Sequence, residues 1–468
     1  MGKSLSLKNI PSVTECDKFL VDQKLPHGKQ VREYVNYVLN KVRQEIINDS
    51  GGIFSINNSE IMKRVADEVQ IRSNTIKRAI NATGIVIHTN LGRAPLSKDL
   101  IMNALPKLCS YSTLELDLVT GKRGARDSRI RTMLRILSGA EDAMVVNNNA
   151  AATFLMLKGL TKNKQEEFLP EVIVSRGELV EIGGSFRVPE IMSEAGVKMV
   201  EIGTTNRCRI SDYEKAFTKN TAAILKVHPS NYKILGFTES VSVENLSKLA
   251  QSKGVPCFYD WGSGSFYQFK NSGLSKYKTV RQELSYSPDL LTFSGDKILG
   301  GIQAGILLGK AGIIQKLRKS PLYRTLRLDK VNLTLMEATL EAYMDIRSLP
   351  NKVPTIFLLE QTAEEISDKA KDFLSKINLK DKALWRFEIK ETESKTGGGA
   401  LPDLNLCSTA IVLSHPQWSV LELQKWFRSQ PIPVITRVHE DHVWLDFRTI
   451  FKNDLDELLK VFSRLILS

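Results

Sequence analysis

A single lysine follows an apolar run in the stretch LLTFSGDKILGG, residues 290–301. The run Leu290–Phe293 is typical of a buried strand, and Ser294-Gly295-Asp296 ends it. Lys297 comes next, either as an ordinary solvated lysine in a turn or as an amine held for covalent chemistry. The residues at the other strand ends bear on this choice, because ligands of open α/β sheets bind where the strands end.

A small polar turn follows the strand-like run Ala143–Val146. It consists of Asn147, Asn148, Asn149 and Ala150 and leads into a good helix-forming segment. The free N–H groups at the start of such a helix can hold a phosphate group, or the asparagines can simply cap the helix.

Asp260 follows another strand-like run, Pro256–Tyr259. A carboxylate at the end of a buried strand needs a cation, which a protonated pyridinium nitrogen would supply; the alternative is an aspartate that caps a loop. Phosphate cradle, strand-end aspartate and strand-end lysine follow one another in the order found in pyridoxal-phosphate enzymes of the aspartate aminotransferase type. In those enzymes the lysine forms a Schiff base and the aspartate keeps the ring nitrogen protonated, so the ring can accept electrons.

Basic residues form two clusters. The segment Lys310–Lys330 contains seven lysines and arginines and one acidic residue. Within it, Arg324 and Arg327 are three positions apart and would share one face of a helix, where paired guanidinium groups suit a phosphate or a carboxylate. For each cluster the alternative is a solvated surface. The second cluster consists of Lys122, Arg123, Arg126 and Arg129.

These candidate residues need a sheet that brings strand ends together. After about residue 78, short β-rich runs alternate with amphipathic helices, which predicts an α/β fold with a mostly parallel sheet covered on both faces. The predicted strands are Ala143–Val146, Val172–Val174, Lys198–Ile202, Ala222–Val227, Pro256–Tyr259 and Leu290–Phe293.

The pattern divides the chain into three predicted domains. Residues 1–75 form a helical module, with helices over Val31–Ile47 and Ser59–Val69. Residues 76–345 form the large α/β domain. Prolines then interrupt the pattern, and residues 346–468 form a small C-terminal α/β domain that includes a flexible glycine-rich loop.

The composition is ordinary for a soluble globular protein except for its charge. The 468 residues include 65 lysines and arginines against 52 acidic residues, which suggests an anionic partner such as nucleic acid, or plain surface charge. Five scattered cysteines without a CxxC pair predict neither a disulfide framework nor a metal site, as expected in the reducing cytoplasm. Since no apolar run approaches about 20 residues, we expect no membrane span.

Several long motifs resemble bacterial selenocysteine synthase, the L-seryl-tRNA(Sec) selenium transferase family. The resemblance covers essentially the whole chain, and the motifs occur in the order of the family. They are INATGIVIHTNLGRAPLS (80–97), VVNNNAAA (145–152), SRGELVEIGGSFRVPEIM (175–192), KVHPSNY (226–232), SGDKILGG (294–301) and YRTLRLDK (323–330).

The resemblance implies a fold-type-I pyridoxal-phosphate transferase with a seven-stranded sheet in a three-layer sandwich. Lys297 would be the Schiff-base lysine, and Asp260 would pair with the ring nitrogen. Because Asp296 is next to Lys297 in the sequence, we expect it to position the lysine or to assist proton transfer. Residues 147–150 would bind the cofactor phosphate. No residue is assigned to stack on the ring, and the segment Arg176–Glu181 is the region considered for that role.

The implied reaction converts L-seryl-tRNA(Sec) to L-selenocysteinyl-tRNA(Sec) with selenophosphate, through a cofactor-bound dehydroalanyl-tRNA intermediate, for selenoprotein synthesis. Arg93, Arg324 and Arg327 would surround the selenophosphate. The helical N-terminal module would contact the tRNA. The family also implies a homodecamer, a pentamer of dimers, with the active sites at the dimer interface.

Two residues depart from the family pattern. Ile302 stands where the family usually has proline, and Trp261 stands where a smaller aliphatic residue is common, which could alter packing of the cofactor pocket.

Two other functions are alternatives to this transferase activity. One is a related pyridoxal-phosphate lyase acting on a phosphorylated amino sugar acid, which would not need the N-terminal module. The other is an inactive RNA-binding protein, which would not need Lys297 and Asp260.

Overall fold

The computed structural model describes residues 10–48, 56–72, 76–161, 168–182, 186–270, 273–377, 384–399 and 404–467. The chain divides into two compact units, residues 1–78 and 79–468. The boundary between a large and a small domain near residue 345 stays a prediction.

The N-terminal unit is helical, as the apolar spacing predicted. Its helices are α1 (Val13–Asp22), α2 (Arg32–Asn48) and α3 (Asn58–Arg72). Ser12 begins α1 with a capping box, because its side chain and that of Glu15 each accept a hydrogen bond from the other's backbone N–H. Between the two helices predicted for this unit, residues 49–55 lie outside the described residues. The three helices share one apolar core that includes Cys16, Leu20, Val35, Leu39, Val42, Ile61, Val65 and Val69.

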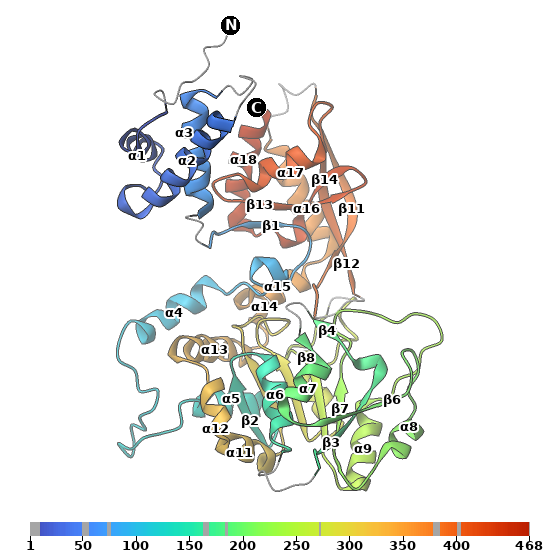
Figure 1. The fold of residues 1–468 in the computed structure, drawn as a ribbon. Helices are drawn as coiled ribbons and strands as arrows, with labels where there is room; N and C mark the ends of the chain where they lie inside the picture. The colour runs from blue at the N-terminus through green and yellow to red at the C-terminus, as the bar shows by residue number, and fades with distance from the viewer. Residues whose placement is uncertain are drawn as a thin grey trace. The chain divides into compact units, whose positions relative to one another are not determined.

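The second unit contains a seven-stranded sheet (Figure 1). Neighbouring strands are parallel except for β10, which is antiparallel to both of its neighbours. All six predicted strands are present, and the mostly parallel sheet is confirmed. In spatial order the strands are β2 (Asp142–Val146), β10 (Gly305–Gly309), β9 (Leu290–Ser294), β8 (Cys257–Ser263), β7 (Thr221–Val227), β3 (Glu171–Ser175) and β6 (Lys198–Ile202).

Both faces of this sheet are buried, which makes three layers. Alternate side chains of a strand point to opposite faces, so Tyr259 and Phe258 on β8 belong to different apolar clusters. One face packs against α5 (Ser128–Ser138), α8 (Ile210–Ala216), α9 (Val243–Lys253) and α13 (Lys330–Tyr343). The other face packs against α6 (Asn149–Lys158), α7 (Val188–Ala195) and α11 (Ala311–Lys319).

The second unit also contains further helices and two short strands. No helix among the described residues is long and apolar enough to cross a membrane. The further elements are α4 (Lys98–Leu108), β4 (Glu181–Ile182), β5 (Phe186–Arg187), α10 (Val280–Leu284), α12 (Pro321–Leu326), α14 (Leu349–Lys352) and α15 (Pro354–Glu360).

The C-terminal part of the second unit forms a separate five-stranded sheet with its own apolar core. Ile80–Ala82, far away in sequence, joins this sheet as β1 by pairing in parallel with Val434–His439, β13. The other strands are β11 (Arg386–Lys395), β12 (Asn405–Ser414) and β14 (His442–Asp446). Its core includes residues of the helices α16 (Ala363–Ser375), α17 (Val420–Arg428) and α18 (Leu455–Leu467).

Candidate functional site

Lys297 lies in the turn that follows β9, and its side chain is buried with only 5% of the residue exposed. Its Nζ atom donates to the carbonyl oxygen of Gly399 at 2.6 Å. Burial lowers the pKa of Lys297 to about 8, the nearby Arg93 acts in the same direction, and Asp260 opposes both. The solvated interpretation is therefore wrong, and Lys297 is an amine that is partly neutral near physiological pH.

Gly399 belongs to the glycine-rich loop that follows β11. The loop packs on the segment after β1, because the backbone N–H of Ile87 donates to the carbonyl of Thr396 at 2.7 Å. Gly397 has φ +118°, and a Cβ there would lie 2.2 Å from the carbonyl oxygen of Ile87, so only glycine fits this close approach. A loop predicted from its composition alone thus supplies the hydrogen-bond acceptor of Lys297.

Asp260 is 5% exposed and lies within β8, not at its end. The strand continues past it to Ser263, and its ladder with β9 is irregular between Asp260 and Gly262. Burial raises the pKa of the Asp260 carboxyl, while hydrogen bonds and the charge of Lys297 oppose the rise. A bound cation would therefore be stabilised strongly here.

Three neutral side chains hold Asp260. Asn149 donates to Oδ1 at 2.8 Å and Thr153, one turn later on α6, donates to Oδ2 at 3.0 Å. Thr292 pairs with Asp260 across the β8–β9 ladder and lies 3.4 Å from Oδ1. Neither threonine was predicted from the sequence, although the four-residue spacing from Asn149 to Thr153 and the strand position of Thr292 were available signals.

Asp296 and Arg93 form an ion pair beside Lys297. The Arg93 Nη1 atom lies 2.6 Å from Asp296 Oδ2, and the N–H of Ala94 donates to the Asp296 carbonyl at 3.2 Å. Arg93 has φ +64°, a conformation that costs free energy for a residue with a side chain and is kept only where contacts enforce it. This geometry brings Arg93 to the lysine site.

Each asparagine of the predicted phosphate loop has a different partner. The Asn148 side chain caps α6 by accepting from the N–H of Ala151 at 2.8 Å. Asn149 holds Asp260. With its amide nitrogen turned toward them, Asn147 donates to the carbonyls of Arg327 at 3.0 Å and Leu326 at 3.3 Å. The groups suited to a phosphate are thus the N–H groups of Asn149 and Ala150 in the first turn of α6.

The paired-arginine interpretation needs a correction. Helix α12 ends at Leu326, and Arg327 is extended with φ −66° and ψ +143°, so Arg324 and Arg327 do not share a helical face. Arg324 is exposed, and among the described residues no hydrogen bond or ion pair joins either arginine to Lys297 or Arg93. The backbone carbonyl of Arg327 instead contacts Asn147 at the end of β2.

Most other residues of the two basic clusters serve the fold. Arg318 donates to both oxygens of the buried Asp127, at 3.1 and 2.7 Å. Arg123 and Arg126 pair with Glu115, while Arg129 pairs with Glu337 and Glu341. The solvated-surface alternative holds for Arg123 and Arg129, whose side chains are exposed, whereas Arg318 and Arg126 are largely covered and neutralise carboxylates.

The charged residues of the segment considered for ring stacking pair with residues outside it. Glu178 is buried against Lys226, and burial raises the pKa of its carboxyl. Arg176 pairs with Glu201. Trp261, the departure noted after Asp260, packs into the apolar core, stacked on Tyr277 with ring centroids 5.4 Å apart. Its bulk therefore fills the core.

Several buried polar atoms around Lys297 have no partner among the described residues. They are Asn149 Oδ1, Ser230 Oγ, Ser263 Oγ and Asp296 Oδ1. A buried polar group without a hydrogen bond is costly, so this edge of the sheet is built for a further polar group. A pyridoxal ring with its charged nitrogen, hydroxyl and phosphate fits the acidic, basic and N–H groups present.

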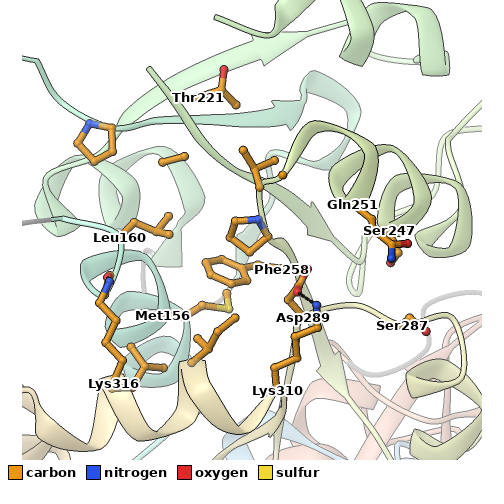
Figure 2. Close-up of a pocket in the computed structure, with 18 of the residues that line it drawn as sticks. Met156, Leu160, Thr221, Ser247, Gln251, Phe258, Ser287, Asp289, Lys310 and Lys316 are labelled. Carbon is orange, nitrogen blue, oxygen red and sulfur yellow. Dashed lines mark hydrogen bonds and ion pairs between the residues drawn. The ribbon is translucent and has the colours of Figure 1, made fainter. Parts of the chain in front are cut away.

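Two cavities lie elsewhere. The larger, about 1390 Å³, opens at the opposite edge of the sheet, beside Thr221 and Asp289, where β7 and β9 begin (Figure 2). Of its four lysines, Lys310 pairs with Asp289 and Lys248 with Glu244, Lys316 donates to the carbonyl of Gly159, and Lys219 lies over the ring of Phe168. A second cavity of about 430 Å³ adjoins the Glu178–Lys226 pair. No metal-binding cluster of His, Cys, Asp or Glu occurs in the described part of the chain.

Comparison with known proteins gives a consistent result. A family model described as L-seryl-tRNA selenium transferase matches residues 79–451. The L-seryl-tRNA(Sec) selenium transferase of Clostridium perfringens (strain 13 / Type A) is 42% identical over 429 residues, which cover 92% of this chain and 91% of the relative. That of Aquifex aeolicus (strain VF5) is 41% identical over 466 residues, 99% of each chain.

A solved structure also has this fold. It is a D-glucosaminate-6-phosphate ammonia-lyase, with a TM-score of 0.60 over 84% of this chain and 96% of that chain. The two sequences are 16% identical, so the likeness concerns the fold alone. It agrees with the fold type expected from the lysine, the aspartate and the alternating strands and helices.

Proposed function

This chain belongs to the L-seryl-tRNA selenium transferase family, and from that premise we propose that it converts L-seryl-tRNA(Sec) to L-selenocysteinyl-tRNA(Sec). Selenophosphate is the selenium donor and pyridoxal phosphate the cofactor. The observation that carries the proposal is Lys297, a buried amine with a pKa lowered to about 8, in a chain 41% identical to a named transferase over 99% of both sequences. The lyase alternative has only the 16% identical fold likeness behind it.

The residues around Lys297 suit pyridoxal phosphate. When bound, this cofactor supplies an electron sink that makes the α-hydrogen of the seryl group acidic. Lys297 would carry the covalent link, and Asp260 would keep the ring nitrogen protonated. The N–H groups of Asn149 and Ala150 would hold the phosphate, since the first turn of α6 leaves them without a helical partner. Asn147 and Asn148 support this turn through their contacts with Leu326, Arg327 and Ala151.

Lys297 is also suited to proton transfer. A pKa of about 8 leaves a useful fraction of neutral amine at neutral pH, which can accept the α-proton of the seryl group and return a proton later. Asp296 stands next to it and fixes Arg93 at 2.6 Å. We assign Asp296 the role of positioning the lysine and the arginine together.

Three arginines would hold selenophosphate, an anion that needs several fixed positive donors. Arg93 is already beside Lys297 through Asp296. Arg327 lies against the start of α6 and its buried Nε atom has no described partner, so it keeps a donor for the ligand. Arg324 is exposed and would complete the set, at the surface where a second subunit is expected.

The remaining parts of the proposal concern partners. The family resemblance supports a homodecamer, a pentamer of dimers with active sites at the dimer interface. Residues 1–78 carry 13 lysines and arginines against 9 acidic residues, a charge that supports tRNA binding by this unit. We place the enzyme in the cytoplasm, where its aminoacyl-tRNA substrate is made. In selenoprotein synthesis its product would be the aminoacyl-tRNA that delivers selenocysteine.

One reaction tests the function. The purified chain, loaded with pyridoxal phosphate, is incubated with L-seryl-tRNA(Sec) and selenophosphate, and the amino acid released from the tRNA is identified. Selenocysteine should appear only when both substrates are present, and Lys297→Ala should abolish it. If no selenocysteine forms, and ammonia is released when a phosphorylated amino sugar acid is supplied in place of the two substrates, the proposal is overturned in favour of a lyase.

A further inference from the structure

Ser230 is a buried hydroxyl with no assigned role. It follows β7 by three residues, in the stretch KVHPSNY, and is 1% exposed. Its Oγ atom has no hydrogen-bond partner among the described residues. Because a buried hydroxyl without a partner is costly, a further group is expected to bind it.

Contacts on both sides fix the position of Ser230. The N–H of His228 donates to the Asp260 carbonyl at 2.9 Å. On the other side, the Asn231 amide donates to the carbonyl of Glu181 at 2.6 Å, and the Tyr232 hydroxyl donates to that of Gly177. The residue two positions before Ser230 is therefore bonded to β8, and the two residues after Ser230 are bonded to the segment that follows β3.

Ser230 reaches the same space as the lysine. A Cβ built on Gly262 would lie 3.9 Å from Ser230 Oγ and 3.9 Å from Lys297 Nζ. Gly262 has φ +73° and follows the irregular point of β8, so the strand carries no side chain where the two groups converge. The serine hydroxyl and the lysine amine thus border one pocket next to Asp260.

The strand order indicates which part of the cofactor meets this hydroxyl. In the sheet, β7 with Ser230 and β2 with the phosphate-binding turn lie on opposite sides of β9 and Lys297. On a pyridoxal ring, one ring carbon carries the aldehyde. The hydroxyl and the phosphate-bearing arm are attached to the two ring carbons on either side of it. A phosphate held at α6 therefore directs the ring hydroxyl toward β7.

We propose that Ser230 donates a hydrogen bond to the ring hydroxyl oxygen of pyridoxal phosphate and thereby tunes the protonation of the linkage to Lys297. The proposal rests on the proposed cofactor site and adds a residue to it. A donor stabilises the negative charge on that oxygen, most of all when the linkage nitrogen has lost its proton. Ser230 therefore favours the unprotonated linkage.

The test is a spectroscopic pH titration of the cofactor-loaded protein, without substrates. Protonation of the linkage changes the visible absorbance, so the titration reports its apparent pKa. In Ser230→Ala this pKa should rise by about one unit, the effect of one hydrogen bond. Ser230→Thr keeps a hydroxyl and should stay close to the wild-type value. Since Ser230 Oγ has no partner in the chain, neither replacement should lower the melting temperature by more than a few degrees.

Ser247→Ala is the matched control. Ser247 is also buried with an unpartnered Oγ atom, but it lines the cavity at the opposite edge of the sheet (Figure 2). Its replacement should leave the spectroscopic pKa unchanged. The proposal is overturned if Ser230→Ala titrates like the wild type, or if Ser230→Thr shifts as far as Ser230→Ala. Either result leaves the cofactor site standing, because that site depends on Lys297→Ala losing the visible absorbance altogether.

Discussion

In the described part of the second unit, two lysines have a pKa that burial lowers, each close to a buried aspartate, and only one of them has the features of a catalytic group. Lys297 lies near Asp260 at the seven-stranded sheet, and Lys369 lies near Asp446 at the five-stranded sheet. Burial lowers the pKa of each lysine to about 8. A lowered lysine pKa therefore does not by itself identify a catalytic site.

The two sites differ in how fully their polar groups are paired. Lys369 donates to Gln361 Oε1 and to the carbonyl of Ile450, both at 3.0 Å. Asp446 accepts from Ser394, Ser408 and the N–H of Arg448. Among the described residues at this sheet, the unpaired buried atoms are Thr436 Oγ1 and the Nε atoms of Arg437 and Arg448, whose other nitrogens are bonded. This network is a structural one.

Around Lys297, by contrast, the unpaired groups include hydroxyl and carboxylate oxygens at the ends of the strands. The hydroxyls of Ser230 and Ser263 and one oxygen of Asp296 are buried and unpaired among the described residues. Lys297 itself has one acceptor, the carbonyl of Gly399. Pairing within the protein stabilises a fold, whereas buried groups that lack partners at strand ends indicate a ligand.

The largest expected difference is between replacements of the two lysines. Lys297→Ala should lower selenocysteinyl-tRNA formation by about 10³-fold or more, because the covalent link and the proton acceptor are lost together. Lys369→Met should keep the activity within a fewfold but destabilise the fold by about 2 kcal/mol, because two buried acceptors lose their donor. Turnover and thermal unfolding of both variants measure this. A stable, inactive Lys369→Met protein would break the comparison.

The aspartates should separate in the same way with a smaller loss of rate. Asp260→Asn removes the charge that would hold the ring nitrogen protonated, and the rate should fall about 100-fold or more. Asp446→Asn should cost about 3 kcal/mol of stability, since its carboxylate joins two serines and the backbone of Arg448. Denaturant unfolding and single-turnover rates provide the measurements. Equal losses of activity in the two variants would contradict the assignment.

The arginines extend the comparison to substrate binding. Arg327→Gln should raise the KM for selenophosphate about tenfold or more, because a charged donor to the anion is lost. Arg318→Gln is the control, since Arg318 pairs with the buried Asp127 and its loss should cost about 3 kcal/mol of stability instead. An unchanged KM in Arg327→Gln would remove this residue from the selenophosphate site.

The smallest effect is one that the two lysines should share. The folded-state pKa of each, about 8, lies below the ordinary value of 10.5, so the unfolded chain binds more protons between these pH values. Both lysines therefore increase the free energy of unfolding as the pH rises from about 8 to 10.5. Lys297→Met and Lys369→Met should each flatten this rise in the cofactor-free protein. Unfolding followed across that pH range measures the slope, and no change in either variant would refute the burial effect.

The sequence predicted the parts of this molecule that depend on local pattern. Strand–helix alternation identified six strands, and the lysine after Phe293 was found from its place at a strand end. β10 was missed because Gly305–Gly309 is short, has glycine at both ends and reads as a continuation of the glycine turn. The helical face expected for Arg324 and Arg327 failed because α12 stops at Leu326.

Contacts between segments that are distant in the chain could not be predicted from the sequence. The Gly399 carbonyl lies 102 positions from Lys297 in the chain. Ser230 and Lys297 both lie beside Gly262, which belongs to a third segment, the strand β8. From the sequence alone, Thr292 is only a residue of a predicted strand. The strand register shows that it lies opposite Asp260. Such pairings depend on tertiary packing, so a single sequence shows the residues without showing that they meet.

The central claim is that Lys297, and not Lys369, binds the cofactor. The most direct measurement is reduction of the cofactor-loaded protein with borohydride, followed by digestion and mass spectrometry of the lysine-containing peptides. The account predicts a pyridoxyl phosphate group on the peptide that contains Lys297 and an unmodified Lys369. Attachment to Lys369 or to any other lysine, with Lys297 unmodified, would contradict it.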